Sequence, residues 1–287
     1  MSKRVFIFSW NAGQFFFPWI NKTNADFYKN PFAPLADDAL ETILQSYDIV
    51  LLWDWPRAAL LYHPAFLAEH RARSYVYFWD HVPAHTDIKK IKEYHTGVYS
   101  FQRNDCETYG LSFNSTVYAP PPAWPREEEI LYDLVFVGGD KNRLQKIRSI
   151  HEACRRQGLR SKVHVRRTPG TQEPNERLED WEISSQSLPY AGVYIQLVRR
   201  SRAILDLCQA GQTGYSLRVM EHIFFDKKLV TDNPVIKRSG FYHPDNIFLI
   251  EEDDIEELKP WLDLPFAPIA QDIKEYYTFE RWIERFA

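Results

Sequence analysis

Glycine, cysteine and long apolar stretches are all scarce in this 287-residue chain, which has 11 glycines and three cysteines. Cys106, Cys154 and Cys208 are widely separated and form no CxxC pair. This spacing indicates neither a disulfide framework nor a structural zinc site. No run approaches the roughly 18 consecutive apolar residues of a membrane-spanning helix. The N-terminal segment lacks a small-residue cleavage pattern, so we expect no signal peptide and a cytoplasmic location.

A strong charge of either sign is also missing. The 35 basic and 39 acidic residues give a formal net charge of −4. General nucleic-acid binders carry a basic surface, so we expect no nucleic acid among the partners, although a local basic site remains compatible with this charge. The sequence is 45% hydrophobic and 15% aromatic, which excludes a disordered chain.

The length and the hydrophobic pattern predict two α/β domains, because short apolar runs alternate with amphipathic helical segments. Pro120–Pro122 and Pro125 interrupt regular structure, and we place the domain boundary there. The expected domains are 1–122 and 123–270, followed by a tail at 271–287 that carries a single amphipathic helix at Ile273–Phe286. The predicted strands are 4–8, 48–53, 74–79, 98–101, 134–137, 162–165, 194–195, 203–207, 228–231 and 247–250.

The start of the second domain has the pattern of an anion site. An apolar strand runs into Gly138 and Gly139, and Lys141 and Arg143 follow at the expected start of a helix. Free backbone N–H groups at a helix N-terminus attract anions. Residues 141–167 contain ten basic residues and one acidic residue. This run is either a wall for a phosphate or another anion, or an ordinary solvated helix face.

A second anion site is predicted near Gly214, where glycines and hydroxyl groups precede a helix that should begin near Ser216. Arg218 and Glu221 lie three residues apart and so share one helix face. An arginine there suits a phosphate, and a carboxylate one turn later suits a ribose diol. Two structural alternatives remain: Glu221 belongs to a helix cap, or it pairs with Arg218.

These segments resemble a family of GT-B glycosyltransferases that build bacterial lipopolysaccharide cores, O-antigens and capsules. The resemblance rests on a Q-x-G at 212–214, the Arg and Glu on the next helix, K-K-L-V-T-D-N at 227–233 and F-Y-x-x-x-N-I at 241–247. It also takes in residues 100–105, 136–143 and 277–282. It covers most of the C-terminal half of the chain and less of the N-terminal half.

The resemblance implies two Rossmann-like domains facing across a cleft, with the C-terminal helix returning to the N-terminal domain. The second domain would hold a nucleotide sugar, and the acceptor would be a hydroxyl of a cell-surface glycan or glycolipid precursor. No metal cofactor is expected, since basic side chains would neutralise the diphosphate and no metal-binding histidine motif occurs. The implied donor-side residues are Arg218 with Lys141 or Arg143 at the phosphates, Glu221 at the ribose, and the loops at Gly138, Gly139, Gly214 and Ser216.

The N-terminal domain would then bind the acceptor with residues that follow its strands. An inverting enzyme needs a general base for the acceptor hydroxyl, whereas a retaining enzyme does not. An aspartate after a strand is also a common turn or cap residue. The candidates for the base are Asp80 and His81, then Asp54, and the acceptor-side candidates are Asn11, Gly13 and Gln14.

Two further alternatives remain open at this point. The aromatic cluster Phe15–Trp19 suits stacking on a sugar, packing at a domain edge, or peripheral contact with the inner membrane. A glycan pyruvyl transferase or a non-catalytic binding subunit would also use a basic anion site.

Overall fold

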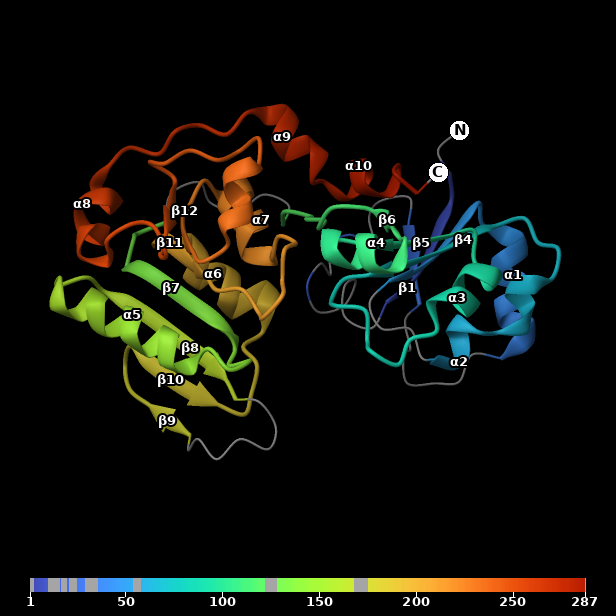
Figure 1. Ribbon diagram of the computed structural model, residues 1–287, viewed down its shortest axis with the longest axis horizontal. Helices are drawn as coiled ribbons and strands as arrows, with labels where there is room; N and C mark the ends of the chain where they lie inside the picture. The colour runs from blue at the N-terminus through green and yellow to red at the C-terminus, as the bar shows by residue number, and fades with distance from the viewer. Residues whose placement is uncertain are drawn as a thin grey trace. The chain divides into compact units, whose positions relative to one another are not determined.

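Alternating apolar runs and helices assemble two parallel sheets in the computed structural model, which describes residues 3–9, 16, 20, 25–28, 36–53, 58–121, 128–167 and 175–286 (Figure 1). The chain divides into two units. Unit 1 comprises residues 1–122 and 277–287, and unit 2 comprises residues 123–276. Among the described residues, no helix combines the length and the apolarity of a membrane-crossing segment.

Unit 1 is built on a six-stranded parallel sheet in the order β2-β1-β3-β4-β5-β6. Its strands are β1 (Val5–Ser9), β2 (Ala25–Phe27), β3 (Ile49–Trp53), β4 (Arg73–Phe78), β5 (Gly97–Ser100) and β6 (Ser112–Phe113). Its helices are α1 (Asp37–Ser46), α2 (Ala58–Leu61), η3 (Pro64–Leu67), α3 (Ile88–Tyr94), α4 (Arg103–Tyr109) and α10 (Phe279–Ile283). The β3 side chains are buried throughout, as expected for a central parallel strand covered on both faces.

Unit 2 contains a seven-stranded sheet in the order β13-β12-β11-β7-β8-β10-β9. Only the edge pair β9 and β10 is antiparallel among the described strand pairs of this sheet. The strands are β7 (Tyr132–Gly139), β8 (Ser161–Arg166), β9 (Glu176–Arg177), β10 (Trp181–Ser184), β11 (Ser201–Asp206), β12 (Lys228–Thr231) and β13 (Ile247–Leu249). The helical segments are α5 (Leu144–Arg156), η4 (Tyr190–Tyr194), α6 (Ile195–Arg199), α7 (Leu217–Phe225), η5 (Pro234–Arg238), η6 (Ile255–Glu257), α8 (Leu258–Asp263) and α9 (Gln271–Tyr276).

The six parallel strands of unit 2 follow the strand order of dinucleotide-binding Rossmann folds. Counted along the chain, they lie in the order 3-2-1-4-5-6, and β7 and β11 are the first and fourth. With right-handed crossovers, this strand order places the connections from these two neighbours on opposite sides of the sheet. Ligands of such sheets bind outside the carboxyl ends of the strands at this point of reversal.

The C-terminal residues complete the core of unit 1. Trp282 and Phe286 are fully buried there. The Trp282 ring lies 4.9 Å from the rings of both Trp53 and Tyr77, and the Phe286 ring lies 4.8 Å from that of Tyr99. The return of the C-terminal helix to the N-terminal half is therefore confirmed. This packing also accounts for part of the high aromatic content of the chain.

Hydrogen bonds hold this tail against the segment that follows β6. The Trp282 indole donates to the Ser115 carbonyl oxygen over 2.9 Å. The Arg285 guanidinium donates to Asn114 Oδ1 and to Ser115 Oγ, each over 2.7 Å. The tail therefore satisfies polar groups that the fold buries, in addition to filling space.

Two predicted elements are wrong in type or extent. The run at Tyr194 and Ile195 is not a strand but the junction of the π-helical turn η4 with α6, because periodicity does not distinguish a short buried strand from a buried helix. The tail contains α9 and α10 rather than one helix. Thr278 separates them in an extended conformation, in which it pairs with Tyr118 and caps α10.

Replacing Trp282 by alanine tests the contribution of the tail to unit 1. Because the side chain is fully buried among other rings, we expect a loss of about 3–5 kcal/mol in the free energy of unfolding. Urea denaturation followed by circular dichroism measures this loss. Leu67, which is 56% exposed, is the matched control, and Leu67→Ala should change stability by less than about 0.5 kcal/mol. Equal effects of the two substitutions would contradict a tail that completes the core.

Candidate anion site at the carboxyl ends of β7 and β11

The predicted anion-site residues gather where the topology of unit 2 places a ligand site. Gly138 and Gly139 end β7, and Asp206 ends the neighbouring strand β11. Helix α7 begins beyond β11, with Ser216 as its N-cap residue. The sequence prediction that this helix begins near Ser216 is confirmed.

Arg143 joins the ends of the two central strands. Its guanidinium donates to the Gly139 carbonyl oxygen over 2.7 Å and also to the carbonyl oxygen of Leu207, the residue after β11. Burial and the nearby positive charge of Arg218 lower the pKa of Arg143 to about 10, which leaves it protonated at neutral pH. The side chain is therefore a fixed positive group at the strand ends.

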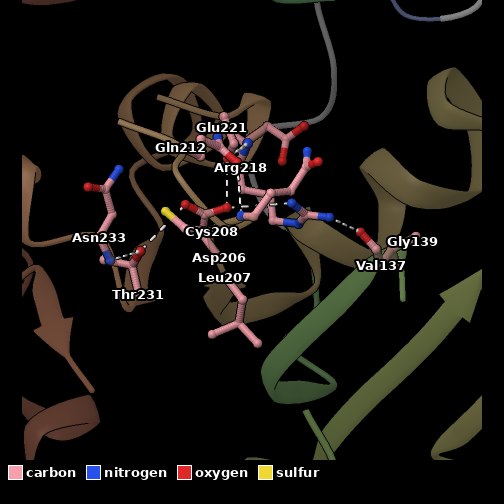
Figure 2. Close-up of polar contacts among 12 residues, drawn as sticks. Val137, Gly139, Asp206, Leu207, Cys208, Gln212, Arg218, Glu221, Thr231 and Asn233 are labelled. Atoms are coloured by element: carbon pink, nitrogen blue, oxygen red, sulfur yellow. Dashed lines mark hydrogen bonds and ion pairs between the residues drawn. The ribbon is translucent and has the colours of Figure 1, made fainter. Parts of the chain in front are cut away.

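Arg218 brings a second guanidinium to the same place, as Figure 2 shows. Its Nη2 donates to the Val137 carbonyl oxygen over 2.5 Å, and its Nη1 lies 3.5 Å from Asp206 Oδ1. The guanidinium carbon lies 5.1 Å from the centre of the Phe136 ring. Its Nε is buried and finds no hydrogen-bond partner within the described parts of the chain. Arg218 therefore keeps one donor group for which the described residues supply no acceptor.

Gly138 is required by the close approach of Arg218. A Cβ atom at this position would lie 2.2 Å from Arg218 Nη2. At Gly139 the nearest atom to a Cβ would be Lys141 Cγ at 3.5 Å, which is an ordinary contact. The two glycines are therefore not equivalent: the first makes room for the guanidinium, and the second does not.

The turn after β7 also exposes Lys141, which has a positive φ of 45°. Gly214 is buried in the loop before α7, where its carbonyl oxygen accepts a hydrogen bond from Gln212 Nε2 over 3.2 Å. Ser216 Oγ accepts from the Arg218 backbone N–H over 3.1 Å and donates to Asp206 over 2.7 Å. These donor-side candidates thus lie around the carboxyl ends of β7 and β11. Their assignment to phosphate or ribose stays a prediction.

Glu221 lies one turn beyond Arg218 and has no exposed surface. Tyr190 donates to Glu221 Oε1 over 2.6 Å, and Tyr194 donates to Oε2. Burial raises the pKa of Glu221 to about 7. Both tyrosines belong to the π-helical turn η4, 27 and 31 residues earlier, so sequence patterns around Glu221 could not identify them.

The basic run at 141–167 is not a continuous cationic surface. Lys146 pairs with Asp232 over 3.0 Å, and Arg156 pairs with Glu256 over 2.7 Å. Arg148 lies 3.5 Å from Glu176, and Arg160 lies 3.9 Å from Asp133. Acidic residues from elsewhere in unit 2 thus neutralise much of the run. Lys141 and Arg143 remain its members at the ends of the central strands.

The motif at 227–247 maintains the fold around the site. Lys228 Nζ donates to the carbonyl oxygens of Asp245 and Trp261 over 2.7 and 2.8 Å. Asn246 makes two hydrogen bonds to the backbone of Ala267, of 2.7 and 2.8 Å. Lys227 donates to the Arg199 carbonyl oxygen. These residue types fix the connections around β12 and β13, which is a structural reason for the motif.

The acceptor-side predictions lie in or next to unit 1. Asp54, Asn11, Gly13 and Gln14 fall outside the described residues. Asp80 is exposed after β4, and its carboxylate accepts from the His81 backbone N–H over 3.0 Å. His81 Nε2 is buried and has no hydrogen-bond partner in the described structure. The general-base role of either residue stays a prediction.

Asp105 lies within the segment 100–105 that the resemblance includes, but no sequence pattern assigned its carboxylate a role. Asp105 Oδ2 accepts from the Val82 backbone N–H over 3.1 Å and lies 3.5 Å from Ser100 Oγ. It thereby connects the segments that follow β4 and β5. In both units, no group of three or more metal-binding side chains occurs among the described residues.

Neither a protein-family model nor a curated protein matches this sequence. Solved structures do match its fold. An α-glucosyltransferase in complex with UDP-glucose and DNA containing an abasic site has a TM-score of 0.63 at 12% identity, and the match covers 99% of this chain and 93% of that chain. The same type of enzyme in complex with UDP and a 13-mer DNA containing a HMU base has a TM-score of 0.60 at 12% identity, over 96% and 91% of the two chains. The phage T4 enzyme BGT in complex with UDP and Mn²⁺ has a TM-score of 0.52 at 12% identity, over 90% and 88%.

Our exclusion of nucleic acid as a partner is wrong, because structures that share this fold hold DNA. The exclusion relied on the net charge of −4. Net charge averages over the whole surface, whereas phosphates are bound by local positive groups. The two-domain α/β fold itself is confirmed: this chain has the fold of the GT-B glycosyltransferases.

Glu221→Gln tests the buried carboxyl group. In the folded protein its pKa is about 7, against an ordinary value of 4.5. Between these values the folded state holds a proton that the unfolded chain has lost. The free energy of unfolding should therefore fall as the pH rises, by about 3 kcal/mol in all. This fall should disappear in the variant, as measured by urea denaturation from pH 4 to 8.

Two buried histidines affect stability in the opposite direction. Burial lowers the pKa of His95 and of His222 to about 4, so each adds stability as the pH rises toward 6.5. Both remain in the variant, and the difference between the two proteins isolates Glu221. A difference that does not change between pH 4 and 8 would contradict the assignment.

Proposed function

We propose that this chain is a glycosyltransferase that moves a sugar from a uridine diphosphate sugar to a hydroxyl group. The observation that carries the proposal is the pair of fixed guanidinium groups, Arg143 and Arg218, at the reversal point between β7 and β11. Carbonyl oxygens orient both groups, and the buried carboxylate in contact with Arg218 is that of Asp206. These carbonyl partners are neutral, so a diphosphate would supply negative charge that they do not.

The arrangement suits the departure of a nucleoside diphosphate. As the bond to the sugar breaks, negative charge develops on the phosphate oxygens. Positive groups that are already oriented stabilise this charge without reorganising, and such preorganisation is often the largest catalytic contribution. Arg143, Arg218 and the backbone N–H groups at the start of α7 would have this role, with Lys141 in the adjacent turn.

Metal independence is part of the proposal. Two arginines supply positive charge that a divalent cation would otherwise provide. Because one structure with this fold holds UDP together with Mn²⁺, the proposal has to be tested directly: transfer should persist in the presence of EDTA.

We further propose that the acceptor hydroxyl belongs to a nucleic acid. Support comes from the α-glucosyltransferase structures of the same fold, which hold DNA with UDP or UDP-glucose. The bases of unmodified DNA carry no hydroxyl group, so the acceptor strand would need a hydroxylated base. The sequence also resembles enzymes of lipopolysaccharide, O-antigen and capsule synthesis. A glycan is therefore the alternative acceptor against which the nucleic acid is tested.

Donor binding is tested with a matched pair of glycine variants. UDP-glucose at 100 times its Kd should raise the stability of the wild-type protein by about 2.7 kcal/mol. Gly138→Ala should weaken UDP binding at least about tenfold, because its methyl group displaces the Arg218 guanidinium. Gly139→Ala, whose methyl group meets an ordinary contact, should bind UDP as the wild type does. Isothermal titration calorimetry measures both affinities.

The donor proposal would be refuted if neither UDP nor UDP-glucose bound the folded wild-type protein. Binding of phosphoenolpyruvate in their place would favour the pyruvyl transferase. Binding of UDP-glucose without hydrolysis or transfer to any acceptor would favour a non-catalytic subunit.

Transfer is tested with radiolabelled UDP-glucose and two acceptors, a DNA duplex with a hydroxymethylated pyrimidine and a lipopolysaccharide core oligosaccharide. We expect labelled DNA, and we expect the unmodified duplex to remain unlabelled. Arg218→Ala should lower turnover by on the order of 10²-fold, since it removes a donor to the leaving group. Labelling of the oligosaccharide alone would contradict the nucleic-acid acceptor while leaving the glycosyltransferase in place.

A further inference from the structure

Asp206 is a buried carboxylate that the sequence patterns did not single out. It is the last residue of β11 and is 1% exposed. Its Oδ1 accepts from Ser216 Oγ over 2.7 Å and lies 3.5 Å from Arg218 Nη1, while Oδ2 lies 3.5 Å from Thr231 Oγ1 (Figure 2). One side chain thus contacts the end of β12 and both the cap and the first turn of α7.

These contacts surround the guanidinium that the proposed function uses. Val137 accepts from Nη2, Asp206 faces Nη1, and Nε is buried with no acceptor in the described parts of unit 2. Arg143 lies close to Arg218, whose positive charge lowers the pKa of Arg143. The negative charge of Asp206 raises that pKa. Asp206 therefore both orients Arg218 and offsets the repulsion between two like charges.

We infer that Asp206 is a positioning residue, which holds Arg218 and the N-terminus of α7 in the arrangement that receives the donor diphosphate before the donor binds. The inference rests on the proposed function, because it concerns how the same anion site is prepared. Asp206 acts through Arg218 and Ser216, and it requires no contact with the nucleotide.

Two effects of opposite sign follow when the Asp206 charge is removed. A carboxylate close to the site repels phosphates, so its loss strengthens the binding of UDP. The same loss releases Arg218 from its fixed orientation, which weakens binding. These effects offset each other in the ground state, whereas the orientation matters more in the transition state, where charge develops on the leaving phosphate.

Asp206→Asn tests the inference by steady-state kinetics with UDP-glucose. We expect kcat to fall at least about tenfold while KM and the Kd of UDP stay within about threefold of the wild-type values. The matched control is Asp133→Asn. Asp133 is a buried aspartate at the opposite end of β7, where it accepts from the Arg160 backbone N–H over 2.8 Å and from Arg202 over 3.2 Å. Its loss should lower the melting temperature without changing kcat.

A second measurement needs no nucleotide. Phenylglyoxal modifies accessible guanidinium groups, and peptide mass spectrometry reads the rate at Arg218. Asp206→Asn should raise this rate several-fold, and Asp133→Asn should leave it unchanged. If Asp206→Asn does not fold, Ser216→Ala replaces it, since it removes the link from Asp206 to α7 and keeps the charge. The expected result is then a lower kcat at unchanged KM.

The outcomes separate the two proposals. Failure of the wild-type protein to bind UDP refutes the proposed function, and the phenylglyoxal rates then decide the inference alone. An unchanged rate at Arg218, or an equal loss of kcat in Asp206→Asn and Asp133→Asn, overturns the positioning role.

Discussion

The interaction between Arg218 and Asp206 is the constraint around which unit 2 is organised. A buried charge is tolerated when it is paired and hydrogen-bonded, and the loss of one partner leaves the other uncompensated. Around this pair, Gly138 lacks the Cβ atom that would clash with Arg218, Ser216 caps α7, and Val137 supplies a carbonyl oxygen. Arg218 contacts Asp206 at the end of β11 and Val137 in β7. The contacts that join these two strands therefore also define the candidate anion site.

Unit 1 meets a different constraint with aromatic packing. Its sheet face is completed by a segment that is far away in sequence. Trp282 and Phe286 pack in tilted and edge-to-face arrangements against rings from three strands, and Arg285 satisfies Asn114 and Ser115. The core of unit 1 therefore requires the last residues of the described chain, and both ends of the sequence contribute to the stability of one unit.

The basic residues fall into two groups according to their partners in the structure. Most of those between 146 and 162 pair with an acidic side chain or a carbonyl oxygen, whereas Arg143 and Arg218 are half-buried at the carboxyl ends of β7 and β11 and held by carbonyl oxygens. The lysines of the motif at 227–228 support the backbone. Charge density along a sequence is therefore a weak guide to an anion site, and the position of each cation relative to a strand end decides its role.

The sequence by itself determined the parallel α/β class, the two units, the start of α7 at Ser216 and the position of Gly138 and Gly139 at the end of a strand. Each of these follows from local patterns: hydrophobic periodicity, turn residues and capping. The partners of Glu221, the role of Asp206 and the pairing of the basic run were decided by the tertiary structure, because they join residues that are between 10 and 105 positions apart. Asp206 lies at the end of an ordinary apolar strand, and nothing local distinguishes it. A one-dimensional pattern records the spacing of residues along an element, but the position of a charge beside another strand end depends on sheet order, which only the folded chain shows.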